Sequence, residues 1–333
     1  MTQHLPEGLD DFLAQAGWGG AAVEPLPGDA SFRRYFRVRD PQEAGRSAML
    51  MDAPPPHEDP RPFLHVGKWL AEHGLRAPRI YAERLDSGLV LIEDFGADRM
   101  RDWLDRHPKA EEAVYARAID ALVELHARPP GPFAAYDMET YLREIALFPE
   151  WFCRLARLDV DVAGFESAWR QVLAPLLERQ GPGVTVLRDY HAENIMLLHP
   201  DEQGGGEQGL IDFQDALVGH RAYDLVSLLQ DARRDVAPEL EQRMLARYAA
   251  SAGTGDDFLA DYARLGAQRN AKIVGIFSRL WKRDGKPRYL DLVPRVWEAM
   301  ERDLAYPALE PVARWFDTNI PRAVREAKGA ALR

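Results

Sequence analysis

The segment that decides the fold is Leu187-Arg188-Asp189-Tyr190-His191-Ala192-Glu193-Asn194, which leads into an apolar run. A second apolar run ends in Ile211-Asp212-Phe213-Gln214-Asp215. If the two runs pair as adjacent strands, Asn194 and Asp212 come to lie side by side. Their amide and carboxylate oxygens suit Mg²⁺, which keeps several waters and shares its other positions with phosphate oxygens. The sequence therefore predicts a metal site made by Asn194 and Asp212.

Asp189 precedes Asn194 by five residues, on the turn before the first strand. Phosphoryl transfer needs a carboxylate to accept the hydroxyl proton, together with metal ligands that neutralise charge on the phosphates. Either motif alone arises often by chance. Together, with Asp212 placed 23 residues after Asp189 and each motif beside an apolar run, they indicate a phosphotransferase.

The region before this segment is rich in predicted strands, and the remainder is mostly helical. Short apolar runs with turn-like boundaries predict strands, and apolar residues at helical spacing predict helices. Ligands favour the cleft between such lobes. We expect a helix over residues 9–16, strands over 23–26, 32–38, 48–51, 79–83 and 89–93, a helix over 62–73, a hinge over 93–96, helices over 110–127, 165–179, 223–232, 238–251, 256–283 and 293–306, and a strand-loop island over 184–213.

The amino-acid composition limits the classes of protein to which the chain can belong. The chain has 333 residues, of which 46% are hydrophobic and 29% charged, which is typical of a folded protein with about two domains. Its net charge of −11 argues against a nucleic-acid partner. The single cysteine, Cys153, excludes an intramolecular disulfide. With no signal sequence or long apolar span, a cytoplasmic protein without a membrane partner is expected, and we expect a monomer.

The motifs at Asp189, Asn194 and Asp212 resemble those of the aminoglycoside phosphotransferase and choline kinase branch of the protein-kinase-like fold. Two further segments, residues 28–37 and 51–55, resemble the bacterial kinases that act on the anomeric hydroxyl of cell-wall amino sugars. The resemblance extends from Gly28 to about Tyr306. It implies an α+β, two-lobe fold, with a nucleotide-binding lobe over residues 1–95 and a helical lobe carrying the catalytic loop and acceptor site over residues 96–333.

The resemblance also implies roles for individual residues. Asp189 resembles the catalytic base, and Asn194 and Asp212 resemble the Mg²⁺ ligands. Asp224, at a helix start, resembles the buried aspartate that holds the catalytic-loop backbone; its other interpretation is an ordinary acidic residue in a first helical turn. The nucleotide-binding set comprises the hinge residues Glu93 and Phe95 and the phosphate-loop residues Ser31, Arg33 and Arg34.

The sequence departs from the family on the third predicted strand, where a lysine usually contacts the α- and β-phosphates. Here the strand reads Ala48-Met49-Leu50-Met51, and Leu187-Arg188 before Asp189 is also unusual. Arg33 and Arg34 are candidates to supply the missing charge, since arginine suits bidentate phosphate contact. Adjacent strand residues point to opposite faces, so only one of the two can face the nucleotide. Lys68 is the next candidate.

Four residues are candidates for the acceptor site: His191, Glu193, Asp215 and Arg279. His191 and Glu193 flank the catalytic loop, where they either shape the sugar site or brace the loop. Asp215 either takes a sugar hydroxyl or caps a turn. Arg279 lies near the end of a long predicted helix.

The sequence thus predicts an ATP-dependent kinase, with ATP as co-substrate and Mg²⁺ as cofactor. Its acceptor is the anomeric hydroxyl of an amino sugar such as N-acetylmuramate or N-acetylglucosamine, in peptidoglycan recycling. Two alternatives remain. One is a kinase of another small acceptor, an aminoglycoside or a choline-like amine, for which Glu193, Asp215 and Asp231 offer negative charge. The other is a nucleotide-binding pseudokinase, suggested by the missing strand lysine.

Overall fold

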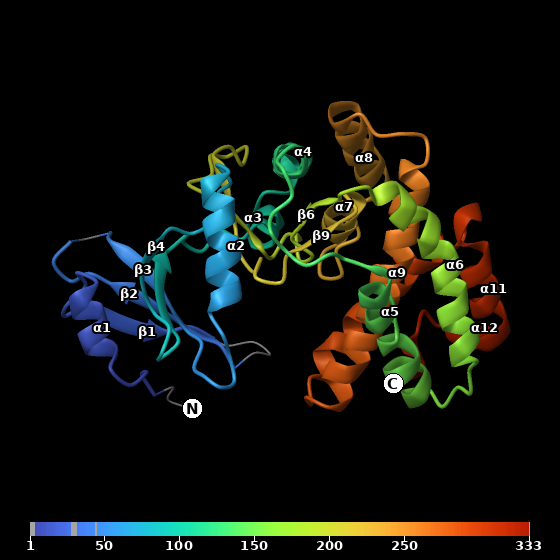
Figure 1. Cartoon of the computed structure of the whole chain (residues 1–333), viewed down its shortest axis with the longest axis horizontal. Coiled ribbons are helices and arrows are strands. Elements are labelled where there is room, and N and C mark those ends of the chain that lie inside the picture. Colours follow the sequence, from blue (N-terminus) through green and yellow to red (C-terminus); the bar gives the residue numbers. More distant parts are fainter. Residues whose placement is uncertain (1–3, 28–31, 44, 333) are drawn as a thin grey trace. The chain divides into compact units, whose positions relative to one another are not determined.

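The structure is a computed structural model that describes residues 4–27, 32–43 and 45–332. The chain forms two compact units, each with its own packing (Figure 1). The first comprises Met1–Trp103 and Asn194–Asp215 and is called here the N-terminal unit. The second comprises Leu104–Glu193 and Ala216–Arg333 and is called the helical unit. The mixture of a sheet and many helices confirms the predicted α+β class.

A five-stranded antiparallel sheet forms the centre of the N-terminal unit. Its strands lie in the order β1-β2-β3-β5-β4. Two helices accompany the sheet, and Figure 1 shows them on either side of the strands. The elements are α1 (Leu9–Gln15), β1 (Ala22–Pro25), β2 (Arg34–Arg39), β3 (Ser47–Asp52), α2 (Arg61–Glu72), β4 (Ile80–Arg84) and β5 (Leu89–Glu93).

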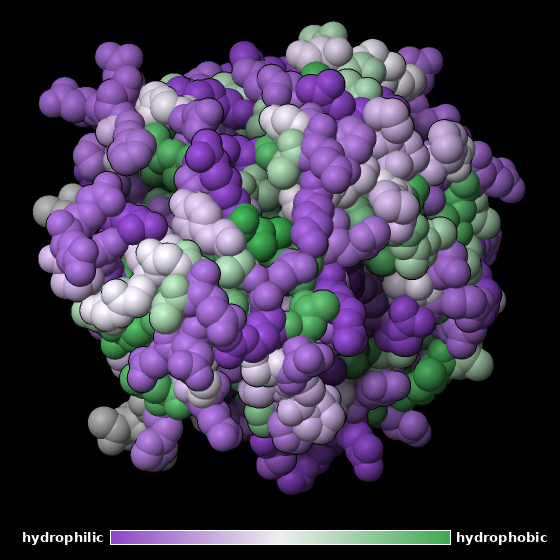
Figure 2. Space-filling view, turned by 60° about the vertical axis from the view of Figure 1, so that its left-hand side comes forward, coloured by the Kyte–Doolittle hydropathy of each residue, from purple (hydrophilic) through white to green (hydrophobic). Residues whose placement is uncertain are grey.

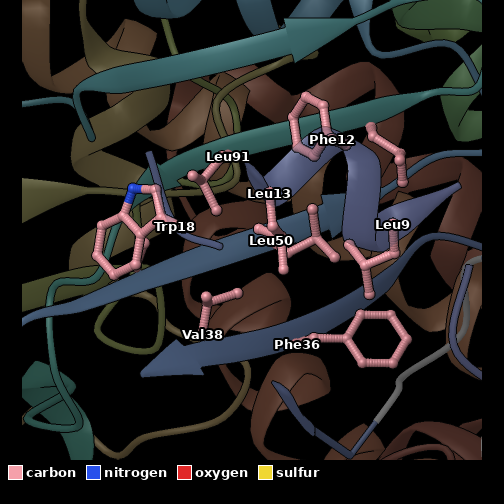
Figure 3. Packing of buried hydrophobic residues seen from close by; sticks show 10 residues of the cluster. Leu9, Phe12, Leu13, Trp18, Phe36, Val38, Leu50 and Leu91 are labelled. Atoms are coloured by element: carbon pink, nitrogen blue, oxygen red, sulfur yellow. The ribbon is translucent and has the colours of Figure 1, made fainter. Parts of the chain in front are cut away.

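One face of this sheet packs against α1. Alternate strand residues point to the same face of a sheet, so the even-numbered positions of β2 and β3 meet the apolar side of the helix. Figure 3 shows the side chains of α1 lying against those of the strands. The buried cluster contains Leu9, Phe12, Leu13, Trp18, Phe36, Val38, Ala48, Leu50, Leu89 and Leu91.

A tight turn that contains Ser87 and Gly88 joins β4 to β5. Gly88 has φ +72°, and a Cβ there would lie 2.0 Å from the carbonyl oxygen of Ala53. Only glycine fits both the left-handed backbone and this close approach. Because Ala53 directly follows β3, this close contact fixes the position at which the chain leaves that strand.

The units do not follow the expected boundaries at residues 95 and 96. A hairpin of β7 (Ile195–Leu198) and β8 (Glu207–Leu210) belongs to the N-terminal unit, although it follows the catalytic loop in sequence. Its backbone explains why: Leu197 N–H donates to the Asp98 carbonyl at 2.8 Å, and Leu210 N–H donates to the Arg76 carbonyl at 2.8 Å. These bonds join segments more than 90 residues apart, which local sequence patterns cannot reveal.

The helical unit is built around α9 (Phe258–Lys282), which is buried over most of its 25 residues. It packs against α5, α7, α10 and the π-helical turn of Phe148–Cys153. The other helices and strands of this unit are α4 (Glu111–His126), α5 (Met138–Ile145), α6 (Val162–Gln180), β6 (Val184–Val186), β9 (Leu217–Gly219), α7 (Ala222–Leu229), α8 (Pro238–Ala252), α10 (Val293–Leu304), α11 (Glu310–Asn319) and α12 (Arg322–Glu326). Helix α3 (Met100–Arg106) begins in the N-terminal unit and ends in the helical unit.

The long helices that the apolar spacing predicted are present, with ends shifted by a few residues. The short helices α5, α11 and α12 were not predicted, and the helix expected over 223–232 ends at Leu229. Figure 2 shows a surface dominated by hydrophilic residues, with small hydrophobic patches between them. Over the described ranges of the chain, no helix is long and apolar enough to cross a membrane.

Candidate active site

The predicted metal ligands come together at the open end of the β7–β8 hairpin. Asn194 directly precedes β7, and Asp212 follows β8 by two residues. The Ile211 N–H donates to the Asn194 carbonyl at 3.1 Å, which holds the two chain segments together. The Asn194 amide then donates to an oxygen of Asp212 at 3.2 Å. The pairing of strands predicted from the sequence therefore places these two side chains side by side.

Asp212 has an unusual backbone conformation, with φ +60°. Few residues other than glycine adopt this left-handed region, and such strain concentrates at functional sites. The next residue, Phe213, is buried and stacks on Phe63 of α2, with ring centroids 5.0 Å apart. This contact fixes the turn, while the Asp212 carboxylate remains exposed and accepts a bond from Gln214 at 2.8 Å. The role of Phe63 was missed at the sequence level, because nothing local links it to Phe213.

The oxygens of Asn194 and Asp212 fit Mg²⁺ rather than a metal held only by protein. Within the described residues, no group of three or more His, Cys, Asp or Glu side chains is placed to hold a metal ion. A Zn²⁺ or Ca²⁺ site would need a larger protein ligand set. One carboxylate and one amide leave room for phosphate oxygens and waters, which is the usual arrangement for Mg²⁺ at a nucleotide.

Arg33, directly before β2, and Arg34, its first residue, have different surroundings. The Arg33 side chain is 12% exposed, forms an ion pair with Glu58 at 3.4 Å and interacts with Tyr35 and Asp212. Arg34 instead donates to the buried Asp52 at 2.8 Å. Only Arg33 is therefore close to the Asn194–Asp212 pair.

Lys68 does not take the place of the missing strand lysine. Its side chain is 54% exposed and pairs with Glu83 at 3.3 Å. On β3, Met49 and Met51 carry no charge. Ser31, also expected in the phosphate loop, lies outside the described residues.

The expected hinge is held by arginines that the sequence analysis did not single out. Arg76 donates two bonds to the Glu93 carboxylate, at 2.8 and 2.6 Å, and these bonds keep the pKa of Glu93 below its ordinary value. The Arg76 guanidinium also lies over the Phe95 ring, 4.7 Å from its centroid. Arg37 donates to Asp94 at 2.7 and 3.1 Å. The side chain of Glu93 is thus engaged by Arg76, and its N–H donates to the Arg79 carbonyl at 2.8 Å.

Asp189 lies on the catalytic loop in the helical unit, after a residue with another left-handed backbone, Arg188 at φ +70°. The loop is fixed by Asp224 of α7, whose carboxylate accepts the N–H groups of Leu187 at 2.7 Å and Arg188 at 2.8 Å. Burial raises the pKa of Asp224 to about 7, although both bonds act in the opposite direction. One turn further along α7, Ser227 donates to the Arg188 carbonyl at 3.1 Å.

The surroundings of Asp189 keep it ionised. Burial alone would raise its pKa, but His191, Lys272 and Arg269 act against burial and hold the pKa below its ordinary value. Arg269 is itself buried and donates to Ser227 at 2.9 Å. A carboxylate that stays ionised at neutral pH can accept a proton.

A second buried carboxylate, Glu144 of α5, joins the cations around the loop. It contacts Arg188, Tyr136 and Lys272, the last at 2.9 Å. Burial opposes its ionisation, but Lys272 and Arg188 outweigh this and lower the pKa of Glu144. Sequence analysis missed Glu144, because it lies 44 residues before Arg188 and follows no motif.

The acceptor-site candidates are dispersed. His191 lies 3.2 Å from a guanidinium nitrogen of Arg233, which also pairs with Glu193 at 3.1 Å. Asp231 accepts the backbone N–H groups of Ala192 at 3.2 Å and Arg233 at 2.8 Å. These contacts favour the loop-bracing role for His191 and Glu193. The other two candidates lie elsewhere: Asp215 is exposed at the end of the hairpin segment in the N-terminal unit, and Arg279 lies on α9.

Glu144→Gln tests the buried cluster. The change leaves the Lys272 and Arg188 charges without a counter-charge, so we expect a loss of about 3 kcal/mol in the free energy of unfolding and a lower kcat. Glu139→Gln on the same helix is the matched control. Glu139 forms a surface ion pair with Arg170, and such a pair contributes less than about 1 kcal/mol to the free energy of unfolding. Denaturant titration and steady-state kinetics measure both effects. Equal stability of the two variants would contradict this role for Glu144.

The sequence profile of the phosphotransferase enzyme family matches residues 22–267. Two relatives are N-acetylmuramate/N-acetylglucosamine kinases. The one from Caulobacter vibrioides is 36% identical and covers 94% of this chain and 96% of its own. The one from Pseudomonas aeruginosa is 39% identical and covers 89% of each chain.

Solved structures share the fold at low sequence identity. A choline/ethanolamine kinase family protein from Mesorhizobium loti has a TM-score of 0.63 at 15% identity, covering 94% of this chain and 97% of its own. An ADP-bound aminoglycoside phosphotransferase has a TM-score of 0.60 at 14% identity, covering 93% of this chain and 98% of its own. The predicted protein-kinase-like fold is thereby confirmed. By its sequence over most of its length, the chain belongs to the phosphotransferase enzyme family.

Proposed function

We propose that the chain is an ATP-dependent kinase that phosphorylates the anomeric hydroxyl of an amino sugar, N-acetylmuramate or N-acetylglucosamine, in peptidoglycan recycling. The observation that carries the proposal is the Asn194–Asp212 pair, which follows an ionised Asp189 in a chain aligned over nearly its full length with kinases of these sugars.

Nucleotide binding falls to the N-terminal unit. Arg33 beside Asp212 supplies the positive charge that the third strand lacks, and the backbone of Glu93 to Phe95 receives the adenine. Asn194 and Asp212 would hold Mg²⁺, and the chemistry that this ion would supply is neutralisation of the phosphate charge.

Asp189 is the proton acceptor. As the anomeric oxygen forms its bond to the γ-phosphorus, the bond from that phosphorus to the bridging oxygen breaks, the hydroxyl proton passes to Asp189, and ADP leaves. A carboxylate of low pKa suits a proton that moves late, after the oxygen has begun to bond phosphorus. Asp224 holds the loop that presents this carboxylate.

Acceptor binding falls to the helical unit, where Arg279 is the remaining candidate, since His191 and Glu193 are engaged by Arg233. A cationic acceptor such as choline is less well supported. Of the three carboxylates that could receive it, Glu193 and Asp231 are engaged by Arg233 and by loop N–H groups, and only Asp215 is exposed.

The function is tested by ADP release with N-acetylmuramate, N-acetylglucosamine, choline and an aminoglycoside, each with and without Mg²⁺. We expect turnover with the two sugars only, and only with the metal. Because a phosphate on the anomeric oxygen blocks the reducing end, the product should no longer react as a reducing sugar. Turnover with choline alone would support the other acceptor class, and turnover with none would support a pseudokinase.

Asp189→Asn removes the proton acceptor, and Asp212→Asn removes the charged metal ligand. Each should lower kcat by about a thousandfold or more, given the size of charge stabilisation in such reactions. Asp120→Asn is the control, since that carboxylate forms a surface pair with Arg247. Circular dichroism checks folding. A folded Asp189 or Asp212 variant with near-parental rates would refute the assignment.

Arg33→Ala should raise the KM for ATP and lower kcat/KM by about 1.5–3 kcal/mol, the size of one charge-assisted bond to phosphate. Arg34→Ala is the matched neighbour. It should change kcat/KM only a few-fold but reduce stability, because Asp52 is buried and loses its partner. Kinetics and thermal unfolding of the two variants separate these effects. If Arg33→Ala is silent, another group provides the phosphate charge.

A further inference from the structure

One side of α9 is open along part of its length, although most of this helix is buried. Lys272, Ile276 and Arg279 are partly exposed and lie in one row, which the exposed Arg283 continues; Leu280, Trp281 and Lys282 are also open near the end of the helix. A spacing of four, three and four residues places the members of the row on one face of the helix. The intervening residues, such as Val274 and Ser278, are buried. The open face thus carries three cations and one apolar side chain.

Arg279 is the cation in this row that no carboxylate of the described residues contacts directly. Across the described parts of the chain, its guanidinium forms no hydrogen bond or ion pair, and its Nε is buried. The charged groups facing it are Arg283, Asp284 and Glu150. Arg283 already engages the Asp284 carboxylate at 2.6 and 3.0 Å. Burial and the nearby Arg283 lower the pKa of Arg279, so an added anion would relieve an unfavourable charge.

The position of Lys272 shows where the row of side chains begins relative to Asp189. It acts electrostatically on Asp189 and pairs with Glu144, so the start of the row lies at the catalytic loop. Arg279 lies seven residues further, which is about 10 Å along the helix axis at 1.5 Å per residue. Arg279 thus lies about two helical turns beyond the cation that acts on Asp189, on the same face of the helix. Ile276 lies between them, where the C–H face of a sugar ring can pack.

We propose that Arg279 binds the carboxylate of the acceptor sugar and thereby favours N-acetylmuramate over N-acetylglucosamine. The two sugars differ by the lactyl ether of N-acetylmuramate, which adds one carboxylate. A guanidinium matches a carboxylate in planar, two-bonded geometry. The inference rests on the proposed function and deepens it, since it assigns the residue that distinguishes the two acceptors.

The test compares kcat/KM for both sugars in the wild-type protein and in Arg279→Gln, Arg279→Lys and Arg283→Gln. Arg279→Gln should lower the preference for N-acetylmuramate over N-acetylglucosamine about tenfold to hundredfold, because losing a hydrogen bond to a charged group changes kcat/KM by about this factor. Arg279→Lys should keep part of the preference. Arg283→Gln, the neighbouring cation paired with Asp284, should change the preference less than threefold. Residual turnover of N-acetylglucosamine shows that each variant is folded.

The methyl ester of N-acetylmuramate completes a double-mutant cycle, because it removes the charge from the ligand instead of the protein. The ester should be a poorer substrate than the acid for the wild-type protein, and the difference should largely disappear in Arg279→Gln. An equal loss on both sugars, or a full ester effect in Arg279→Gln, would overturn this inference and leave the kinase function intact. A wild-type protein inactive on both sugars would overturn the function, and this inference with it.

Discussion

Two backbone N–H groups directed at one buried carboxylate fix the catalytic loop. Asp224 accepts both, from Leu187 and Arg188, and so determines the position of the next residue, Asp189. The left-handed backbone of Arg188 costs about 1–2 kcal/mol, and the two N–H groups that donate to the Asp224 carboxyl, at about 1 kcal/mol each, can offset that cost. Because Asp224 and Ser227 lie one turn apart on α7, the same helix holds both the N–H groups and the carbonyl of this turn. A loop held by a rigid helix at three points can present a side chain in a single orientation.

Positive charge is concentrated around this loop, although the chain as a whole is acidic, with a net charge of −11. Lys272 and Arg269 keep Asp189 ionised, and Glu144 in turn compensates Lys272 and Arg188. The arrangement separates two roles for buried carboxylates in the helical unit. Glu144 is surrounded by donors on several sides and serves to organise charge. Asp189 is under the influence of the same cations but belongs to a loop, where an acceptor hydroxyl can approach it.

Local sequence patterns were sufficient for the parts of the site that depend on strand geometry. The pairing of Asn194 with Asp212 follows from two apolar runs, and the different surroundings of Arg33 and Arg34 agree with the expectation that neighbouring residues there point to opposite sides. Long-range pairings were not predictable. Arg76 reaches Glu93 from the segment after α2, and Glu144 reaches Arg188 from an unpredicted helix. The boundary at residue 95 differed for the same reason, since hydrogen bonds from β7 and β8 connect that hairpin to residues far earlier in the chain.

Arg279 shows how folding and function compete in such a chain. The folding free energy would improve if this half-buried guanidinium were paired, because burying an uncompensated charge is costly. Elsewhere in the helical unit the chain does pair its arginines, as with Arg179 and Asp261 or Arg233 and Glu193. A nearby carboxylate on the protein would also compete with an anionic ligand for the same guanidinium. An unpaired cation is therefore the arrangement that binding an anion requires, and the stability it costs is recovered only when the ligand is bound.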